Sequence, residues 1–380
     1  MNFQSKLPNV GTTIFTVMSA LANEHQAINL SQGFPNFDCS PELKNLVNKY
    51  LQNGYNQYAP MGGAFPLLEK LAQKIDKLYG TTVNPKTELT ITAGATQALF
   101  TAITAFIREG DEVILIEPAY DSYAPSVEVV GGVVVPYEMK APDFKINWEE
   151  LEKLVTPKTR MLIINTPHNP TGSILLEKDL QIVERLAEEN DLIVLSDEVY
   201  EHLIFDGEEH QSVLRFPKLF QRSLAVYSFG KTFHSTGWKL GYCVAPEHLM
   251  KEFRKVHQFN VFCVNSFVQY AIAEYLEDDS TYLSLNSFYQ QKRDFFLEKI
   301  KNSRFRPIPC KGTYFQLVDY SEISDEPEVE FAKRMTEEFG VAVIPVSVFY
   351  SKKINQKVVR VCFAKTEELL EEAATLLQKI

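Results

Sequence analysis

Short apolar runs recur through the middle of the chain and alternate with stretches of helical periodicity. Continuous runs rich in Val, Ile and Leu are typical of strands that are buried on both faces of a parallel sheet. Helices are expected between them, for example over 95–108 and 177–190. The expected strands are Leu89–Thr92, Val113–Ile116, Val133–Tyr137, Met161–Asn165, Leu192–Leu195, Leu224–Tyr227 and Tyr242–Ala245. The pattern predicts an α/β fold whose large domain holds a mainly parallel seven-stranded sheet between helices.

The two ends of the chain have a different pattern. Helices are expected near 14–21, with Thr12 or Thr13 as cap, and then over 41–52 and 65–79. Beyond about residue 280 a long polar helix leads to further strands and a closing helix, which is typical of a smaller α+β domain. We therefore predict an N-terminal arm with part of the small domain at 1–43, a large domain at 44–280, and a small C-terminal domain at 281–380.

Composition and charge exclude several classes of protein. The net charge of −11 over 380 residues disfavours nucleic acid or an anionic membrane as the main partner. No apolar run reaches the roughly 18 residues of a membrane span. The five cysteines contain no C-x-x-C and the seven histidines no H-E-x-x-H, so we expect no metal site. These features predict a cytoplasmic protein with reduced thiols that binds neither nucleic acid nor membrane.

One lysine stands out at the end of an expected strand. Lys231 follows Leu224–Tyr227 and lies among small and apolar residues, and Lys239 follows eight residues later. Desolvation at such a place lowers the pKa of the amine and makes it a usable nucleophile. The alternative is an exposed loop lysine among turn glycines.

Other strand ends carry polar residues that suit a ligand, because ligands bind at the carboxyl ends of parallel strands. The turn at Thr92–Gln97 opens a helix, and its free N–H groups around Ala95 and Thr96 suit a phosphate. The alternative is an ordinary helix start. Asn169 lies in a turn fixed by two prolines and a glycine, and can donate its amide N–H to an oxygen. Plain turn chemistry is the alternative there.

A carboxylate and an arginine complete the set. Asp197 ends a buried strand, where its charge is costly without a cationic partner, and Tyr200 shares its face; a helix N-cap is the alternative role. Arg360 lies inside an apolar strand and either grips a substrate carboxylate or forms a structural ion pair. One ligand satisfies every stretch: pyridoxal 5′-phosphate, with an aldehyde for the lysine, a ring nitrogen for the aspartate and a phosphate.

The same stretches carry a resemblance to a known family. They are Asn29–Pro35, Asn56–Tyr58, Asn165–Pro170, Ser196–Tyr200, Ser228–Thr232, Gly237–Lys239 and Val359–Phe363. In this order they resemble the class I/II pyridoxal-phosphate aminotransferases of fold type I. The chain is most similar to their kynurenine aminotransferase/glutamine transaminase K branch, and within it to bacterial methionine aminotransferases. Many members of the wider family have Arg where this chain has Lys239, and this branch shares the lysine.

The resemblance implies a role for each candidate residue. Lys231 would form the Schiff base and move the substrate proton, while Asp197 would hold the ring nitrogen. Substrate binding would fall to Gly33, Asn169 and Arg360 at the carboxylate, and to Phe15 and the partner subunit's Phe262 at the side chain. The other implied cofactor contacts are Tyr120 on the ring face, Asn169 and Tyr200 at the ring oxygen, and Ala95, Thr96, Ser228, Lys239 and the neighbouring subunit's Tyr58 at the phosphate. A homodimer with shared active sites follows.

The expected substrate is a large neutral amino acid, such as methionine, an aromatic amino acid, leucine or glutamine, with a 2-oxo acid as acceptor. The apolar candidates and the lack of an obvious second arginine disfavour aspartate. Kynurenine as the main substrate, or a carbon–sulfur β-lyase acting on cysteine conjugates, are the alternatives within enzymes. A non-catalytic regulator would need a DNA-binding segment, and a NAD-linked dehydrogenase would need the missing G-x-G-x-x-G.

Overall fold

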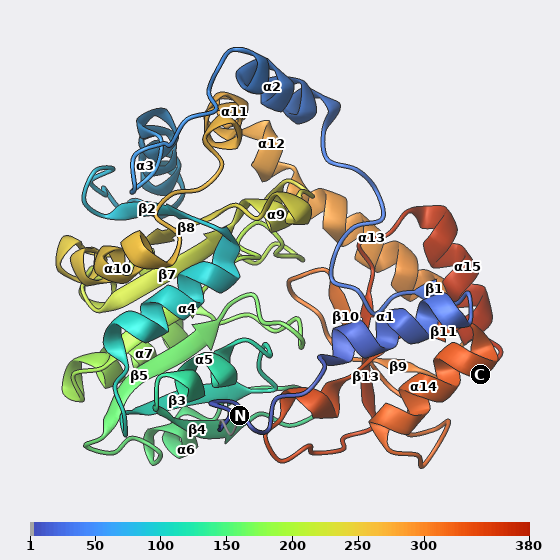
Figure 1. Cartoon of the computed structure of the whole chain (residues 1–380). Coiled ribbons are helices and arrows are strands. Elements are labelled where there is room, and N and C mark those ends of the chain that lie inside the picture. Colours follow the sequence, from blue (N-terminus) through green and yellow to red (C-terminus); the bar gives the residue numbers. More distant parts are fainter. Residues whose placement is uncertain (1–3) are drawn as a thin grey trace.

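The computed structural model describes residues 4–380 (Figure 1). Over these residues it holds a large seven-stranded sheet, a smaller four-stranded sheet and a two-stranded pair, with helices around the two larger sheets. The larger sheet has seven strands. In spatial order they are β2 (Leu89–Thr92), β8 (Gly241–Val244), β7 (Ser223–Ser228), β6 (Ile193–Asp197), β5 (Thr159–Asn165), β3 (Glu112–Glu117) and β4 (Val133–Glu138). All neighbours are parallel except that β8 runs antiparallel to β2 and β7. The predicted seven-stranded, mainly parallel sheet is confirmed.

Both faces of this sheet are buried, because alternate side chains of each strand point to opposite faces. Val113 and Leu115 of β3 pack into the cluster formed with α4 (Gly94–Phe106), α5 (Tyr123–Val129) and α10 (Glu247–Asn260). Ile114 and Ile116 pack on the other side. That side is covered by α3 (Phe65–Tyr79), α6 (Trp148–Glu152), α7 (Glu177–Glu189) and α8 (Pro217–Phe220). The strands therefore read as continuous apolar runs.

The smaller sheet collects the C-terminal strands. Its antiparallel order is β12 (Ile344–Pro345), β13 (Val358–Cys362), β10 (Phe315–Asp319) and β9 (Arg306–Pro307). Around it lie α13 (Leu285–Ile300), α14 (Glu328–Phe339) and α15 (Glu367–Leu377). The N-terminal segment joins this part, because α1 (Ile14–Glu24) lies beside α14 and β1 (Ile28–Asn29) pairs with β11 (Val341–Ala342) (Figure 1). The exact domain limits stay a prediction.

Local signals explain where several helices begin and end. Thr13 accepts a hydrogen bond from the Thr16 N–H and caps α1, as one of the two threonines was predicted to do. Ser40 caps α2 (Pro41–Gln52), which has proline at its first position. Gly80, with φ of 67°, ends α3. The remaining elements are α9 (Phe229–Thr232), α11 (Ser266–Tyr275), α12 (Ser280–Leu283) and the 3-10 turns η1 (Val213–Arg215), η2 (Thr236–Trp238) and η3 (Val346–Phe349).

None of the helices within residues 4–380 has the length and apolar character needed to cross a membrane. The carboxyl ends of β5, β6 and β7 face the smaller sheet (Figure 1). The chain segments that carry the predicted site residues meet there.

Candidate active site

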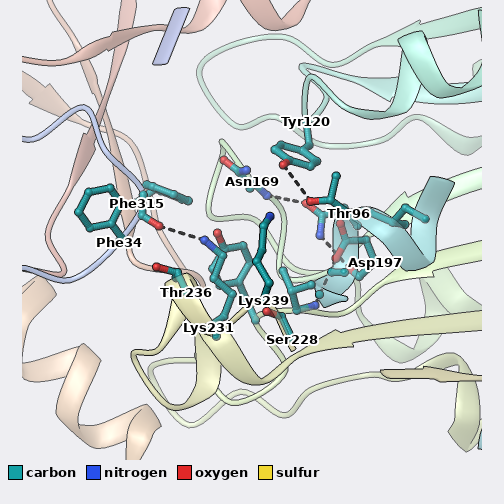
Figure 2. A pocket seen from close by; sticks show the side chains of 18 of the residues that line it. Phe34, Thr96, Tyr120, Asn169, Asp197, Ser228, Lys231, Thr236, Lys239 and Phe315 are labelled. Carbon is teal, nitrogen blue, oxygen red and sulfur yellow. Dashed lines mark hydrogen bonds between the residues drawn. The ribbon is translucent and has the colours of Figure 1, made fainter. Parts of the chain in front are cut away.

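A cavity of about 330 Å³ lies where the large sheet meets the smaller one. It is lined by every predicted site residue except two: Phe15, Gly33, Ala95, Thr96, Tyr120, Asn169, Asp197, Tyr200, Ser228, Lys231, Lys239 and Arg360. Figure 2 shows Lys231, Asp197 and Asn169 pointing into this space. Asp197 ends β6, and the other two lie shortly after the ends of β7 and β5. Parallel strands explain the meeting, since their carboxyl ends reach the same edge of the sheet.

Lys231 reaches the cavity from α9, the short helix directly after β7. Its Nζ donates one hydrogen bond to the Gly33 carbonyl oxygen at 3.0 Å and another to the Tyr314 hydroxyl at 2.9 Å. Burial lowers the pKa of this amine to about 8. A useful fraction of the amine is therefore uncharged near neutral pH, which is the state that a nucleophile or base needs.

Asp197 ends β6 and is only 4% exposed. Tyr123 donates its hydroxyl to one carboxylate oxygen at 2.6 Å, and the Val199 N–H donates to the other at 3.3 Å. Burial outweighs these bonds and raises the pKa of Asp197 to about 6. Such a carboxyl group favours a cationic partner beside it, so the site suits a protonated ring nitrogen.

The N-terminus of α4 forms a second, anion-binding part of the cavity. Its N-cap, Ala93, provides no side-chain hydrogen bond to the first turn, and the backbone at Gly94 has a φ of 74°. Ala95 and Thr96 therefore face the cavity with uncapped N–H groups at the positive end of the helix dipole. Ser228 and Lys239 line the same region and add a hydroxyl and a cation. This arrangement is suited to a phosphate.

Arg360 lies in β13 and is 1% exposed. Its guanidinium donates to Asn169 Oδ1 at 2.8 Å and to the Ser31 carbonyl oxygen at 3.0 Å, and its centre lies 3.8 Å from the Phe315 ring centroid. Among residues 4–380, Arg360 Nε has no hydrogen-bond partner, and no carboxylate forms an ion pair with the Arg360 guanidinium. A buried arginine without an anion favours the substrate-carboxylate role over the structural ion pair.

Asn169 and Asn165 connect Arg360 to Asp197 through a chain of hydrogen bonds. Because Asn169 Oδ1 accepts from Arg360, the amide N–H groups of this side chain stay available to donate. The Asn169 N–H donates to Asn165 Oδ1 at 2.7 Å, and Asn165 donates to the Asp197 carbonyl oxygen at 2.8 Å. Tyr120 lies with its hydroxyl 3.4 Å from Thr96 Oγ1 (Figure 2). Asn165, the last residue of β5, thus helps to fix the positions of both Asn169 and Asp197.

Two predicted residues lie outside the cavity. Tyr58 and Phe262 contact each other edge to face at 5.4 Å, and they are 84% and 42% exposed. They line no part of the cavity of their own chain. Both were predicted to act on a partner subunit.

Sequence reasoning missed several residues that complete the site. Tyr123 donates a hydrogen bond to Asp197, and Asn165 accepts one from Asn169. Tyr314 accepts a hydrogen bond from Lys231, and the Phe315 ring lies against Arg360. Asn165 ends a predicted strand, and this position was a usable signal. Tyr123, Tyr314 and Phe315 read as ordinary core aromatics, and nothing in the local pattern distinguishes them.

Comparisons with known proteins agree with this site. The family model for aminotransferase class I and II matches residues 25–377. The methionine aminotransferase of Escherichia coli (strain K12) is 48% identical over 378 residues, which are 99% of this chain and 98% of that protein. Kynurenine–oxoglutarate transaminase 1 of Homo sapiens is 34% identical over 395 residues, covering 94% and 93% of the two chains.

A solved structure agrees in the same way. A crystal structure of an Escherichia coli protein with an identified methionine aminotransferase function superposes with a TM-score of 0.98 at 48% identity, covering 100% of both chains. These matches confirm the fold class and the resemblance that the motifs indicated. The chain belongs to the class I and II aminotransferases, a family that uses pyridoxal phosphate.

Proposed function

We propose that this chain holds pyridoxal 5′-phosphate in the cavity and transfers the α-amino group of a large neutral amino acid, methionine foremost, to a 2-oxo acid. One observation carries the proposal: four features line a single cavity. They are a lysine amine of lowered pKa, a buried aspartate, an uncapped helix N-terminus and an arginine without an anion. The methionine aminotransferase that is 48% identical over nearly the whole chain supports the choice of substrate.

The residues present fit this cofactor. Burial raises the pKa of Asp197 to about 6, and a protonated ring nitrogen beside it would favour the charged carboxylate. Ala95, Thr96, Ser228 and Lys239 would hold the phosphate, while Asn169 and Tyr200 would donate to the ring oxygen and Tyr120 would lie on the ring face. When bound, the cofactor supplies an electron sink for the bond that breaks at the substrate Cα.

The chain's own residues bind the substrate and move its proton. Arg360, with Asn169 and the Gly33 backbone, would bind the α-carboxylate and orient the Cα–H bond. The amine of Lys231, whose pKa is about 8, is able to accept that proton and return it at neutral pH. Lys231 and Arg360 line the same cavity, which supports this division of roles.

The cavity walls favour a neutral substrate side chain. Phe15, Phe34 and Phe315 line it and offer apolar contact. Arg360 is the only arginine among the described residues that line it, so no second guanidinium is available there for a distal carboxylate. These contacts support methionine and aromatic donors over aspartate.

We also propose a homodimer with shared sites. In it, Tyr58 would reach the phosphate in the neighbouring subunit and Phe262 would line that subunit's side-chain pocket. Their outward exposure supports this arrangement, because it leaves both rings free to contact a neighbouring chain.

A donor panel tests the proposed reaction. The purified protein loaded with cofactor is assayed with methionine, phenylalanine, leucine, glutamine, kynurenine and aspartate against several 2-oxo acids. We expect kcat/KM for methionine to exceed that for aspartate by at least about tenfold, because the pocket lacks a partner for a second carboxylate. The Lys231→Ala control should fold normally, yet lose at least about a thousandfold in turnover.

Three results would contradict parts of this proposal. Equal specificity constants for aspartate and methionine would contradict the substrate class. Pyruvate and ammonia released from a cysteine conjugate without any 2-oxo acid would favour the carbon–sulfur lyase. A colourless protein that takes up no cofactor would reject the reaction as a whole.

A further inference from the structure

The amine of Lys231 lies in a closed group of three hydrogen-bonding partners that includes a tyrosine with no predicted role. Lys231 Nζ donates to the Tyr314 hydroxyl at 2.9 Å and to the Gly33 carbonyl oxygen at 3.0 Å. The Tyr314 hydroxyl donates to the same carbonyl oxygen at 2.6 Å. Figure 2 shows the Lys231 side chain ending in such a hydrogen bond, away from Asp197.

The direction of these bonds is fixed by chemistry. A carbonyl oxygen only accepts, so the single proton of the Tyr314 hydroxyl points to Gly33. A lone pair of the same hydroxyl oxygen is then left for the lysine amine. Burial raises the pKa of Tyr314 well above its ordinary range, so this proton stays in place across neutral pH.

The backbone holds Tyr314 firmly in this position. Thr313, with a φ of 68°, donates its N–H to the Leu203 carbonyl oxygen at 3.0 Å. Phe363 donates its N–H to the Tyr314 carbonyl oxygen, also at 3.0 Å. The side chain is fully buried and its ring packs edge to face on Tyr200 at 5.2 Å. The hydroxyl is therefore a fixed acceptor rather than a mobile one.

Tyr314 itself does not line the cavity, so its hydroxyl acts on the site through Lys231. In the proposed reaction, the lysine amine is bonded to the cofactor for one part of each cycle and free for the other. Lys231 Nζ lies between the Gly33 carbonyl oxygen and the Tyr314 hydroxyl.

Resting on that proposed function, we propose that Tyr314 is a positioning residue for Lys231. Its hydroxyl receives the lysine amine whenever that amine is not bonded to the cofactor, and holds it beside the Gly33 carbonyl within reach of the substrate. The free-lysine half of the cycle is thereby stabilised relative to the bonded half. The substrate-binding segment at Gly33 and the reacting lysine are also coupled by the same contact.

The test compares Tyr314→Phe with Tyr289→Phe. Tyr289 is a matched control because it is also fully buried, its ring lies 5.7 Å from that of Tyr314, and its hydroxyl has no partner among residues 4–380. Each substitution removes one buried hydroxyl from the same aromatic cluster. Only the first removes a contact to Lys231.

The first measurement needs no cofactor. The full-length cofactor-free chain is pulse-labelled with acetic anhydride between pH 6 and 10, and acetylation of Lys231 is followed by mass spectrometry. In Tyr314→Phe, the ammonium form of Lys231 loses a hydrogen-bond acceptor, so the pKa of the amine should fall by about one unit. Lys231 should then be labelled about fivefold faster near pH 7, because more of the amine is uncharged. Tyr289→Phe should match the wild type.

The second measurement uses the loaded enzyme at equilibrium. At a fixed ratio of methionine to its 2-oxo acid, absorbance gives the proportion of cofactor in its aldehyde and amine forms. Tyr314→Phe should shift this ratio about tenfold towards the aldehyde form, because the free lysine has lost a hydrogen bond. Tyr314→Met also lacks the hydroxyl and replaces Tyr314→Phe as the test variant if the latter fails to fold. It should shift both measurements in the same direction.

Two outcomes are decisive. If the Tyr314 variants match Tyr289→Phe in labelling and in the cofactor ratio, the positioning role is wrong. If the wild-type chain takes up no cofactor, the proposed function fails, and the labelling result still decides whether Tyr314 holds the lysine.

Discussion

At the scale of single residues, Asp197 shows how burial prepares a side chain for a partner. Its carboxylate accepts bonds from Tyr123 and the Val199 N–H, yet neither carries a full positive charge. The pKa of Asp197 is raised from 3.8 to about 6. The folded chain therefore binds this proton more tightly than the unfolded chain does.

This difference predicts a pH-dependent effect of Asp197→Asn in the cofactor-free chain. In the wild type, the raised pKa of Asp197 adds to the free energy of unfolding. This contribution is fully present below pH 3.8 and is lost as the pH rises through about 6. Relative to the wild type, the free energy of unfolding of the variant should rise by about 1–2 kcal/mol between pH 5 and pH 7. Urea unfolding at the two pH values measures this. An equal difference at both would contradict the raised pKa.

The residues that could be predicted from the sequence share one property: each lies at the end of a strand or breaks the pattern of its segment. Lys231 and Asp197 follow apolar runs, and Arg360 interrupts one. Tyr314 lies 83 positions from Lys231 in the chain, and only the packing of the small sheet against the large one brings them together. An aromatic residue beside a strand is the commonest pattern for a core position, so it carried no signal.

At the scale of elements, the site depends on the close approach of β8 to the first turn of α4. A Cβ atom at Gly241 would lie 2.5 Å from the Tyr227 carbonyl oxygen and 3.1 Å from the Ala95 nitrogen. Only glycine leaves room for this contact. The strand thereby fixes the helix N-terminus that faces the cavity.

Gly241→Ala should therefore weaken cofactor binding as well as the fold. Moving α4 or β8 apart should cost about 1–3 kcal/mol in the free energy of unfolding. We expect the Kd for pyridoxal phosphate, measured by fluorescence titration, to rise at least about tenfold as the helix N–H groups shift. Gly237→Ala is the matched control, because a Cβ there meets no atom within 4 Å. Similar losses in both variants would show that close packing at Gly241 is not the cause.

Element prediction from the sequence succeeded where periodicity and caps agreed. The bounds of α2 and α3 match the prediction, since proline and glycine mark their ends. Helices α10, α11 and α14 were not predicted. Two of them begin directly after a proline without a side-chain cap, at Pro246 and Pro327, and their buried faces become evident only once their neighbours are in place.

At the scale of the whole molecule, the outer surface carries aromatic side chains that the single chain does not cover. Phe259 is 87% exposed at the end of α10, three positions before Phe262, which pairs with the exposed Tyr58. Neighbouring exposed aromatic side chains are typical of surfaces that contact another chain. The proposed shared-site dimer would cover Tyr58 and Phe262, and it would make each site depend on two chains.

Complementation between two defective variants tests that dependence. Lys231→Ala and Tyr58→Ala are each purified, freed of excess cofactor, and then mixed under conditions that exchange subunits. If Tyr58 acts on the neighbouring site, each mixed dimer has one site with both defects and one intact site. Half of the dimers are then mixed, so activity should recover to roughly a quarter of the wild-type value.

The same experiment separates the alternatives. If Tyr58 acts within its own chain, every site in a mixed dimer keeps one defect and no activity returns. The Lys231→Ala protein mixed with itself is the baseline, and light scattering before and after mixing shows whether dimers form and persist. Because the recovered activity comes only from sites built by two chains, its absence in a mixture with proven subunit exchange would contradict the shared site, whatever the oligomeric state.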